Sequence, residues 1–390
     1  METAIAGMGP AGVNAAKTLR KNGFNGNITM FSAEKTPPYS PPALGDYLIT
    51  GNDRVLFWEG RDFCDAYDIN CRSGVAAAGI IPEKKILITE NKEDIYFDHL
   101  VIASGSSLYA PVKGAWKKGV LNYKTLAGTQ RIREIASRDG HKSAIVVGGG
   151  FIGVEIALCL AKSGIKVSLL NRRGWIMPRL LDRETAEYVR NDLESQGINV
   201  LLKTEASEFA GKDQVECLLT SDNRELKADI YIAATGVKPN IDFVRDSGID
   251  CDRGVLVNSY LKTRYPFIYA CGDVAETIDR ISGKRTIHGL FPTAVHHGIT
   301  AGYNILGRHI PYEQEISMNS LKKLSFKLIV AGCLNGDVIK YKTEEILRKI
   351  YIKDNKISGF VLLRDISNAG GLLSLLMKRA DIRACRKQLL

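Results

Sequence analysis

The chain lacks an apolar stretch long enough to cross a membrane. Of its 390 residues 45% are hydrophobic and 25% charged, and no apolar run approaches the roughly 18 residues that a spanning helix needs. The first residues, METAIAGMGPAG, also lack the basic leader and small-residue cleavage site of a signal peptide. We therefore expect no membrane association and, by default, a cytoplasmic protein.

Pairs of cysteines with the short spacing typical of metal or redox sites are also absent. None of the eight cysteines forms a Cys-x-x-Cys pair, so we expect no metal site. We expect most of these residues to be small core side chains; they are Cys64, Cys71, Cys159, Cys217, Cys251, Cys271, Cys333 and Cys385. The segment EKTPPYSPPALGDYLITG, Glu34 to Gly51, contains no cysteine at all.

No nucleic-acid-binding module, and no interleaving of aromatic with basic residues, accompanies the formal charge of +10. We therefore expect no nucleic acid partner. The charge suits an acidic protein partner or solubility alone. The length predicts two or three domains.

A strand, a glycine turn and a helix open the chain. Thr3 to Gly7 is apolar, the turn reads Gly7-Met8-Gly9-Pro10-Ala11-Gly12, and VNAAKTLRKNG has helical periodicity up to Gly23. In such a turn the first glycine makes the bend, the second lets backbone approach a pyrophosphate, and the third allows close helix packing. The next strand ends at Glu34, whose carboxylate suits a ribose diol. This unit predicts a dinucleotide site.

The same unit recurs some 140 residues later, where KSAIVVGGG leads into Gly148-Gly149-Gly150-Phe151-Ile152-Gly153 and a helix ending at Gly164. Two such units predict two nucleotide domains, and so two dinucleotides or one enzyme that passes electrons between them. The following strand ends in Asn171-Arg172-Arg173. Two guanidiniums there suit a ribose 2'-phosphate and slightly favour NADPH over NADH, although a solvated strand end is the alternative.

Further motifs resemble the FAD-dependent pyridine nucleotide-disulfide oxidoreductase superfamily over nearly the whole chain. YFDHLVIASGSSLYAP, Tyr96 to Pro111, resembles the exit from the FAD domain, and ADIYIAATGVKPN, Ala228 to Asn240, resembles the return from the NAD(P)H domain. TRYPFIYACGDVAE, Thr263 to Glu276, resembles the motif whose aspartate, here Asp273, hydrogen-bonds the FAD ribityl chain. Without the family, Gly272-Asp273 would be read as an ordinary turn.

The resemblance implies an α/β fold with two Rossmann-like, three-layer ββα dinucleotide-binding domains and a small α+β C-terminal domain. The FAD-binding domain would be split between residues 1–112 and 239–312, with a small meander from about Ile69 to Phe97. Residues 113–238 would bind NAD(P)H. Residues 313–390, with the strands FKLIVAGC, EILRKIYIK and KISGFVLL before the helix GLLSLLMKR, would form a reduced interface domain, which leaves a homodimer open.

The resemblance also implies two sets of binding residues. Those expected at FAD are Gly7, Gly9, Pro10, Ala11, Gly12, Glu34, Lys35, Val75, Ala103, Ser104, Gly105, Gly272, Asp273, His296 and His297. Those expected at NAD(P)H are Gly148, Gly150, Phe151, Ile152, Gly153, Glu155, Asn171, Arg172, Arg173 and Gly236.

The cysteine-free segment acquires a meaning from this family. In its disulfide reductase, peroxidase and coenzyme A-disulfide branches a redox cysteine follows the ribose-binding acid beside the flavin, because sulfur can take two electrons and form a disulfide or sulfenate. Here that segment reads Tyr39-Ser40-Pro41-Pro42-Ala43-Leu44-Gly45-Asp46, without a thiol. Cys64 and Cys71 follow Glu34 by 30 residues or more and are not expected to be catalytic.

The segment resembles instead the rubredoxin and ferredoxin reductases and the flavin portion of nitrite reductases, which carry a Pro-Tyr-x-Arg-Pro-x-Leu type sequence. Pro41 replaces the arginine, which puts one contact to the FAD diphosphate in doubt, and Lys35 could supply charge instead. Several ferredoxin-reductase relatives place near Asp46 a lysine that pairs with the glutamate equivalent to Glu155. Because both positions are acidic here, the rubredoxin-reductase relatives are favoured, and one carboxyl would have a raised pKa if the two face each other.

The implied activity is hydride transfer between C4 of NAD(P)H and N5 of FAD, followed by single-electron transfer to an acidic iron-sulfur carrier of rubredoxin or ferredoxin type. The net charge of +10 suits such a carrier, although the clusters Lys117-Lys118, Lys322-Lys323 and Arg383 to Lys387 could be ordinary solvated faces. The alternatives are an NAD(P)H oxidase that reduces oxygen, and an electron-entry subunit or redox sensor of a larger complex.

Two further side chains have alternative interpretations. Glu155 would lie near the nicotinamide as a catalytic residue, or would be a helix N-terminal carboxylate favoured by the helix dipole. His296 and His297 open a helix that in relatives points at the flavin pyrimidine edge. One of them would stabilise the reduced flavin, or both would be packed helix histidines.

Overall fold

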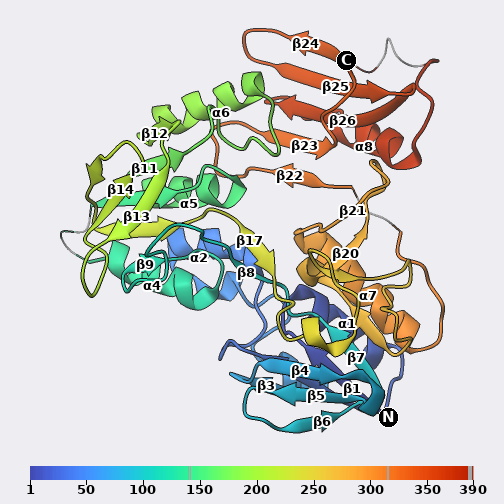
Figure 1. Ribbon diagram of the computed structural model, residues 1–390. Coiled ribbons are helices and arrows are strands. Elements are labelled where there is room, and N and C mark those ends of the chain that lie inside the picture. The colour runs from blue at the N-terminus through green and yellow to red at the C-terminus, as the bar shows by residue number, and fades with distance from the viewer. Residues whose placement is uncertain (139, 141, 314–315, 385–388, 390) are drawn as a thin grey trace.

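The computed structural model describes residues 1–138, 140, 142–313, 316–384 and 389, so Cys385 and the end of the basic stretch 383–387 lie outside the described residues. Two five-stranded parallel sheets with the same strand order form most of the molecule (Figure 1). The first has the order β19 (Ile268–Ala270), β7 (His99–Ile102), β1 (Glu2–Ala6), β2 (Asn27–Ser32) and β3 (Asn70–Ser73). The second has the order β9 (Val120–Leu121), β16 (Ile230–Ala233), β10 (Ser143–Val147), β11 (Lys166–Asn171) and β12 (Asn199–Leu202).

The central strands β1 and β10 are buried along nearly their whole length, as expected for parallel strands covered on both faces. Each is followed by its glycine turn and then by α1 (Pro10–Lys21) or α5 (Phe151–Lys162). The glycines expected to end these helices, Gly23 and Gly164, have left-handed φ angles of 83° and 81°. The expected α/β fold and the internal repeat are therefore confirmed.

An antiparallel meander of three strands follows β3 of the first parallel sheet and β12 of the second. The first comprises β4 (Ala77–Ile81), β5 (Ile86–Thr89) and β6 (Asp94–Tyr96), and the second β13 (Ala206–Ala210), β14 (Cys217–Thr220) and β15 (Glu225–Leu226). The expectation that the meander begins near Ile69 was wrong, because Asn70–Ser73 pairs in parallel with β2. That pairing satisfies the backbone groups along the outer side of β2, which would otherwise lack partners.

Helix α7 (Phe291–Ile305) packs closely on α1. A Cβ atom at Gly298 would lie 2.2 Å from the backbone oxygen of Ala11, and one at Gly302 would lie 2.8 Å from Thr18 Cβ. Glycine at both positions therefore lets the two helices approach behind the first sheet. The remaining longer helices are α4 (Leu126–Ala136) and α6 (Arg183–Ser195).

Two antiparallel strands join the halves that carry the two parallel sheets: β8 (Ser106–Leu108) runs toward the second sheet and β17 (Val237–Pro239) runs back. Short elements complete these halves. They are α2 (Leu44–Thr50), α3 (Phe63–Ala66), β18 (Val255–Leu256), β20 (Ala275–Ile278), β21 (Arg285–Thr286) and the 3-10 turns η1 (Pro41–Ala43), η2 (Asp53–Val55), η3 (Pro82–Lys84), η4 (Arg245–Ser247) and η5 (Gly272–Val274).

The C-terminal sheet is antiparallel and has the order β22 (Met318–Ser320), β23 (Leu328–Gly332), β26 (Lys356–Leu363), β25 (Leu347–Lys353) and β24 (Asp337–Lys342). The three expected strands and the helix, α8 (Ala369–Lys378), are present. The strands β22 and β24 were not predicted, because they are short or largely exposed and so carry little apolar pattern. Within the described residues, none of the helices is long and apolar enough to cross a bilayer.

The central strands of the C-terminal sheet, β23, β26 and β25, are buried on both faces. Phe360 and Leu362 pack with Leu372 and Leu376 of α8. On the other face Leu347, Tyr351, Val361 and Leu363 share a core with residues of α2, α5 and α6. Figure 1 shows this sheet beside α6. The C-terminal sheet thus rests on the half of the molecule that carries the second parallel sheet.

Candidate functional site

The turn between β1 and α1 is built around three glycines with different surroundings. A Cβ at Gly7 (φ 131°) would lie 2.0 Å from the backbone oxygen of Ala103, and one at Gly12 would lie 2.0 Å from that of Gly7. A Cβ at Gly9 would meet nothing within 4 Å. Gly9 is also the N-cap of α1, with no side-chain cap and with Pro10 at the first helical position. The turn therefore leaves open space in front of a helix N-terminus, which is an arrangement suited to a phosphate group.

The turn between β10 and α5 repeats this geometry. A Cβ at Gly148 (φ 118°) would lie 2.3 Å from the backbone oxygen of Ala234, and one at Gly153 would lie 1.7 Å from that of Gly148. Gly150 faces open space and is the N-cap of α5, whose first residues are Phe151 and Ile152. A second anion cradle of the same design thus lies in the other half of the molecule.

Glu34 lies just beyond β2, at the edge of the first cradle. Its carboxylate accepts a hydrogen bond from Tyr39 Oη at 3.1 Å, and Tyr39 Oη accepts one from the backbone N–H of Leu126. Burial raises the pKa of Glu34, and the hydrogen bond from Tyr39 acts against that rise. The hydrogen bond between Tyr39 and Glu34 was not predicted, since nothing in the local sequence pattern indicates it.

Two other expected residues flank this edge of the first sheet. The stem of exposed Lys35 lies 3.0 Å from the Cβ position of Gly74. The backbone N–H of Val75 donates to Ser32 O at 2.8 Å, which places Val75 at the end of β2. Both residues are therefore near Glu34 along the same sheet edge.

The corresponding position of the second sheet is Asn171, whose side chain is buried and donates to Trp175 O at 2.6 Å. It therefore orders the loop that carries Arg172 and Arg173, both of which are exposed. The guanidinium of Arg172 lies 3.7 Å from the carboxylate of Glu205. An ion pair this exposed contributes little to stability, so the arginines are available to an anion at this edge.

Asp273 lies where β7, β8 and α7 meet. Its carboxylate accepts a hydrogen bond from Ser106 Oγ at 2.6 Å and lies 3.4 Å from Lys124 Nζ. Gly272 (φ 77°) precedes it at the start of η5. The sequence indicated Asp273, but Ser106 and Lys124 are distant from it along the chain and were missed.

The strand end at Ala103, Ser104 and Gly105 also reaches this region. Ala103 donates its backbone N–H to Ala6 O, and Ser104 Oγ donates to Asn240 O at 2.9 Å. Asn240 returns a hydrogen bond from its side chain to Ser104 O at 2.8 Å. This reciprocal pair fixes the segment that leaves the first sheet to the segment that returns to it.

His296 and His297 differ in their surroundings. His296 is exposed, whereas His297 is 1% exposed and accepts a hydrogen bond at Nδ1 from the backbone N–H of Gly272. Burial, helped by the charges of His288 and His296, lowers the pKa of His297 to about 3. The ring packs edge-on against Tyr312, with centroids 4.4 Å apart. His297 is thus a neutral, packed side chain that holds the Gly272 turn.

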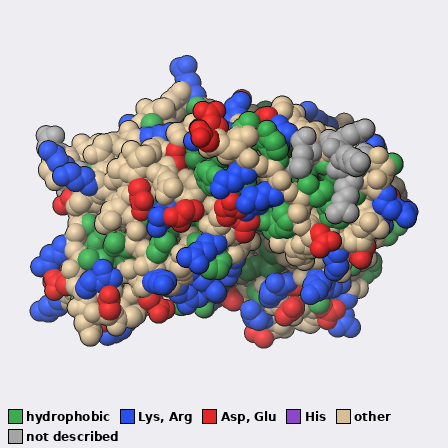
Figure 2. Space-filling view, turned by 90° about the horizontal axis from the view of Figure 1, so that it is seen from above, with side chains coloured by type: hydrophobic (Ala, Val, Ile, Leu, Met, Phe, Trp, Pro, Cys, Tyr) green, Lys and Arg blue, Asp and Glu red, His purple; other side chains and the backbone are tan. Residues whose placement is uncertain are grey.

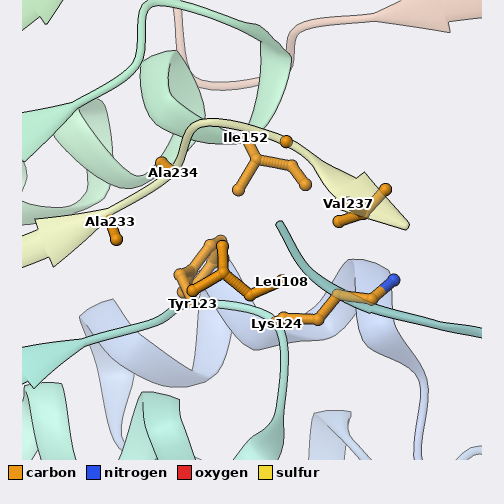
Figure 3. A pocket seen from close by; sticks show the side chains of 8 residues that line it. Leu108, Tyr123, Lys124, Ile152, Ala233, Ala234 and Val237 are labelled. Atoms are coloured by element: carbon orange, nitrogen blue, oxygen red, sulfur yellow. The ribbon is translucent and has the colours of Figure 1, made fainter. Parts of the chain in front are cut away.

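A narrow cavity lies between the second glycine turn and the segments that join the two halves. Figure 3 shows Ile152 and Val237 on one side and Leu108, Tyr123 and Lys124 on the other. Gly236, whose Cβ position meets nothing within 4 Å, also lines it. Its volume of about 10 Å³ holds about one water molecule. A planar ring could enter only if some of these side chains moved.

Glu155 faces α2 from the N-terminal half of α5. Its Oε1 lies 3.5 Å from the Cβ position of Gly45, next to Asp46. Burial raises the pKa of Glu155, and the charge of Asp46 adds to the rise while Lys323 and Lys322 oppose it. Lys323, which precedes the C-terminal strand β23, forms an ion pair with Asp46. The expected raised carboxyl pKa is therefore present, but the sequence did not indicate that a lysine from elsewhere in the chain joins the pair.

The thiol of Cys159, a residue of α5, lies next to the start of α2, although α2 itself contains no cysteine. Cys159 Sγ of α5 lies 3.2 Å from the Cβ position of Gly45. The side chain is 0% exposed, and burial raises its pKa to about 12. Because the thiolate is the reactive form, Cys159 is an inert core residue at neutral pH.

Cys64 and Cys71 form a disulfide that ties α3 to β3. The sequence did not predict this pair; the chain between the two cysteines turns back and brings their side chains together. The bridge lies at the outer edge of the first sheet, where β3 pairs with β2. In the described part of the chain, no group of three or more His, Cys, Asp or Glu side chains is arranged to hold a metal ion.

The basic clusters noted in the sequence are partly neutralised. Lys323 pairs with Asp46 and Arg383 pairs with Asp381, while Lys117 Nζ donates to Gly211 O. Figure 2 shows that Lys and Arg side chains on the face seen from above are interspersed with Asp and Glu. The net positive charge is therefore not gathered into a single patch on that face.

Comparisons with known proteins agree with this geometry. The model of the family described as pyridine nucleotide-disulphide oxidoreductase matches residues 1–298. The nitrite reductase [NAD(P)H] of Bacillus subtilis is 31% identical over 408 residues, which cover 98% of this chain and 48% of that protein. The chain thus spans about half the length of that relative.

Other relatives match over most of their length. The NADH-rubredoxin oxidoreductase of Clostridium acetobutylicum is 29% identical over 93% of this chain and 91% of that protein. The crystal structure of NADH:rubredoxin oxidoreductase from the same organism has a TM-score of 0.80 and 27% identity, and covers 99% of this chain and 97% of that one.

Proposed function

Because the chain belongs to the pyridine nucleotide-disulphide oxidoreductase family, we propose that it binds FAD and NADH or NADPH and passes electrons between the nicotinamide and a one-electron iron-sulfur carrier. FAD, when bound, exchanges a hydride with the nicotinamide and releases or accepts electrons singly. The protein's part is to hold two dinucleotides against each other and to exclude side reactions.

FAD is assigned to the first cradle. The open space at Gly9 accepts the pyrophosphate at the N-terminus of α1, and Glu34 receives the ribose hydroxyls. Asp273, held by Ser106 and Lys124, offers its carboxylate to the ribityl hydroxyls. We propose that residues 1–112 and 239–312 form this FAD-binding domain.

The nicotinamide dinucleotide is assigned to the second cradle, within a domain of residues 113–238. Gly150 supplies the open space at the N-terminus of α5. The exposed guanidiniums of Arg172 and Arg173 are placed to meet a ribose 2'-phosphate, so NADPH is slightly favoured. Ile152, Val237 and Tyr123, which line the cavity beside this turn, would contact the nicotinamide. Glu155, which lies close to Tyr123, would be near it.

One observation carries the choice of acceptor: the start of α2 offers no reactive sulfur. The thiol of Cys159 lies close to Gly45 at the start of α2, but it is buried and protonated. Without a thiolate, a disulfide or sulfenate cannot form there. Electrons therefore leave directly for an external carrier, as the name of the NADH-rubredoxin oxidoreductase indicates for that relative.

A second candidate function follows from the nitrite reductase relative. This chain matches about half of that protein. In an electron-entry role the acceptor is another protein segment or subunit rather than a diffusing carrier. This role uses the same two dinucleotide sites and the same transfer of electrons from the flavin. A small C-terminal sheet suits such a docking role.

The test is anaerobic stopped-flow reduction of the purified yellow protein by NADH and NADPH, followed by mixing with rubredoxin, ferredoxin or air-saturated buffer. We expect rapid bleaching of the flavin and faster reoxidation by an iron protein than by oxygen. If oxygen is the fastest acceptor, the protein is an oxidase. If neither nucleotide bleaches the flavin, the proposed direction of electron transfer is wrong.

A further inference from the structure

The contact between Lys323 and Asp46 joins two distant parts of the chain at one face of Glu155. Asp46 lies in the first turn of α2, and Lys323 lies in the segment 321–327 between β22 and β23. The two side chains form an ion pair. Glu155 Oε1 lies 3.5 Å from the position that a Cβ atom would occupy at Gly45, the residue before Asp46. A lysine from the segment before β23 thus pairs with the carboxylate of Asp46, which neighbours the residue that Glu155 of α5 approaches.

The segment that carries Lys323 is anchored on both sides. Leu321 and Leu324 are 4% and 8% exposed and belong to the core shared by α2 and α5. The backbone N–H and the hydroxyl of Ser325 both donate to the carboxylate of Asp192 in α6. Asp192 is itself buried. The position of Lys323 is therefore set by packing and by hydrogen bonds rather than by its own ion pair.

The charges around Glu155 show why this lysine matters. The titratable groups around Glu155 come from four parts of the chain. They are Asp46 of α2, Tyr123 just before α4, Cys159 of α5, and Lys322 and Lys323 of the segment before β23. Burial and the charge of Asp46 disfavour a negative charge on Glu155, whereas Lys323 and Lys322 favour it. Lys323 acts more strongly than Lys322, since Lys322 is exposed and Lys323 is only partly exposed.

We propose that Lys323 is a positioning residue of the nicotinamide site: its ion pair with Asp46 brings a positive charge from the segment before β23 to the cluster that contains Glu155. This rests on the proposed function only in assigning the nicotinamide to the neighbourhood of Glu155. The first turn of α2 carries an acid instead of a lysine, and the charge arrives from a segment some 277 residues further along the chain. The segment before β23 is then part of the site, because it carries the lysine that pairs with Asp46.

The test follows the titration of Glu155 by infrared spectroscopy, which needs no turnover. The carboxylic acid band that disappears in Glu155→Gln identifies the residue. In Lys323→Met we expect this titration to move to higher pH by about one unit, since a nearby opposite charge has been removed. Lys322→Met is the matched control, with the same change one residue away, and should move it by less than about 0.3 units.

Two further variants keep the test decisive if Lys323→Met folds poorly. Lys323→Arg retains the charge and should titrate as the original protein does. Asp46→Lys combined with Lys323→Asp reverses the pair and should restore the titration that Lys323→Asp alone disturbs. Identical curves for the original protein and Lys323→Met, or an equal shift in Lys322→Met, would overturn the proposal.

Flavin bleaching by NADH and NADPH is recorded on the same samples. If the original protein is not bleached, the proposed function fails, while the infrared titration still decides the role of Lys323. If the original protein is bleached, we expect the pH dependence of the bleaching rate to move in Lys323→Met in the same direction as the titration. A bleaching profile that does not move would contradict the assignment of Lys323 to the nicotinamide site.

Discussion

Tyr39 Oη lies 3.1 Å from Glu34 Oε1 and joins the end of β2 to the N-terminus of α4, because it also accepts the backbone N–H of Leu126. The tyrosine thus holds the carboxylate of Glu34 in place and favours its charged form. Tyr39→Phe should weaken FAD binding about fivefold, as expected for loss of one hydrogen bond to a charged group. Fluorescence titration of the apoprotein with FAD measures this, with exposed Tyr96→Phe as the control. An unchanged affinity would remove Glu34 from the FAD site.

The glycines of the first turn should separate binding from folding. Gly9→Ala places a methyl group in open space, so the protein should fold normally but bind FAD at least about tenfold more weakly. Gly12→Ala places its methyl 2.0 Å from Gly7 O and should destabilise the fold by about 1–3 kcal/mol. Gly150→Ala should retain FAD and lose affinity for the nicotinamide dinucleotide. Urea unfolding and flavin content measure the three effects, and loss of FAD in Gly150→Ala would contradict the assignment of the two cradles.

Replacing the two exposed arginines should change the nucleotide preference without affecting stability. In Arg172→Ala/Arg173→Ala the rate of flavin bleaching by NADPH should fall about tenfold, because the guanidinium contacts to the 2'-phosphate are lost. The rate with NADH should stay within about twofold. The exposed pair between Arg172 and Glu205 contributes little, so the melting temperature should not change. Equal losses with both nucleotides would show that these side chains do not distinguish them.

The disulfide between Cys64 and Cys71 should act on stability and not on electron transfer. It closes a loop with a sequence separation of 7, so Cys64→Ser/Cys71→Ser should lower the free energy of unfolding by about 2 kcal/mol. Flavin bleaching should be unaffected, because the bridge lies on the outer edge of the first sheet. Urea unfolding with and without dithiothreitol provides the measurement, since the reductant should reproduce the effect of the double variant. A slower bleaching rate in that variant would indicate that the bridge takes part in electron transfer.

Asp182 should make the contact between the C-terminal sheet and α6 sensitive to acid. Its carboxylate accepts hydrogen bonds from Lys349 Nζ and Tyr351 Oη, and its pKa is lowered from 3.8 to about 2. Because the pKa of Asp182 is lower in the folded protein, its charged carboxylate stabilises the fold above pH 3.8. This contribution is lost as the pH falls toward 2. Asp182→Asn keeps the N-cap of α6 and should cost about 1–2 kcal/mol at pH 7, with less of the loss remaining at pH 3. Thermal unfolding across this pH range is the measurement; a loss independent of pH would mean that packing, not charge, joins the two parts.

The sequence by itself determined the two nucleotide units. The order of strand, glycine turn and helix is local, and only glycine fits at Gly7, Gly12, Gly148 and Gly153, where a Cβ atom would meet backbone within 2.3 Å. Local order therefore specified both parallel sheets and both cradles. It also showed that α2 contains no thiol.

Tertiary structure decided which distant side chains meet at those cradles. Lys323 reaches Asp46 across 277 residues, Ser106 reaches Asp273 across 167, and Cys159 fills the space beside Gly45. The pairing of Cys64 with Cys71 and the neutral state of His297 likewise depend on how the chain folds back and what it buries. Charge and burial act through space, so contacts between elements that follow no sequence period appear only when the chain is folded.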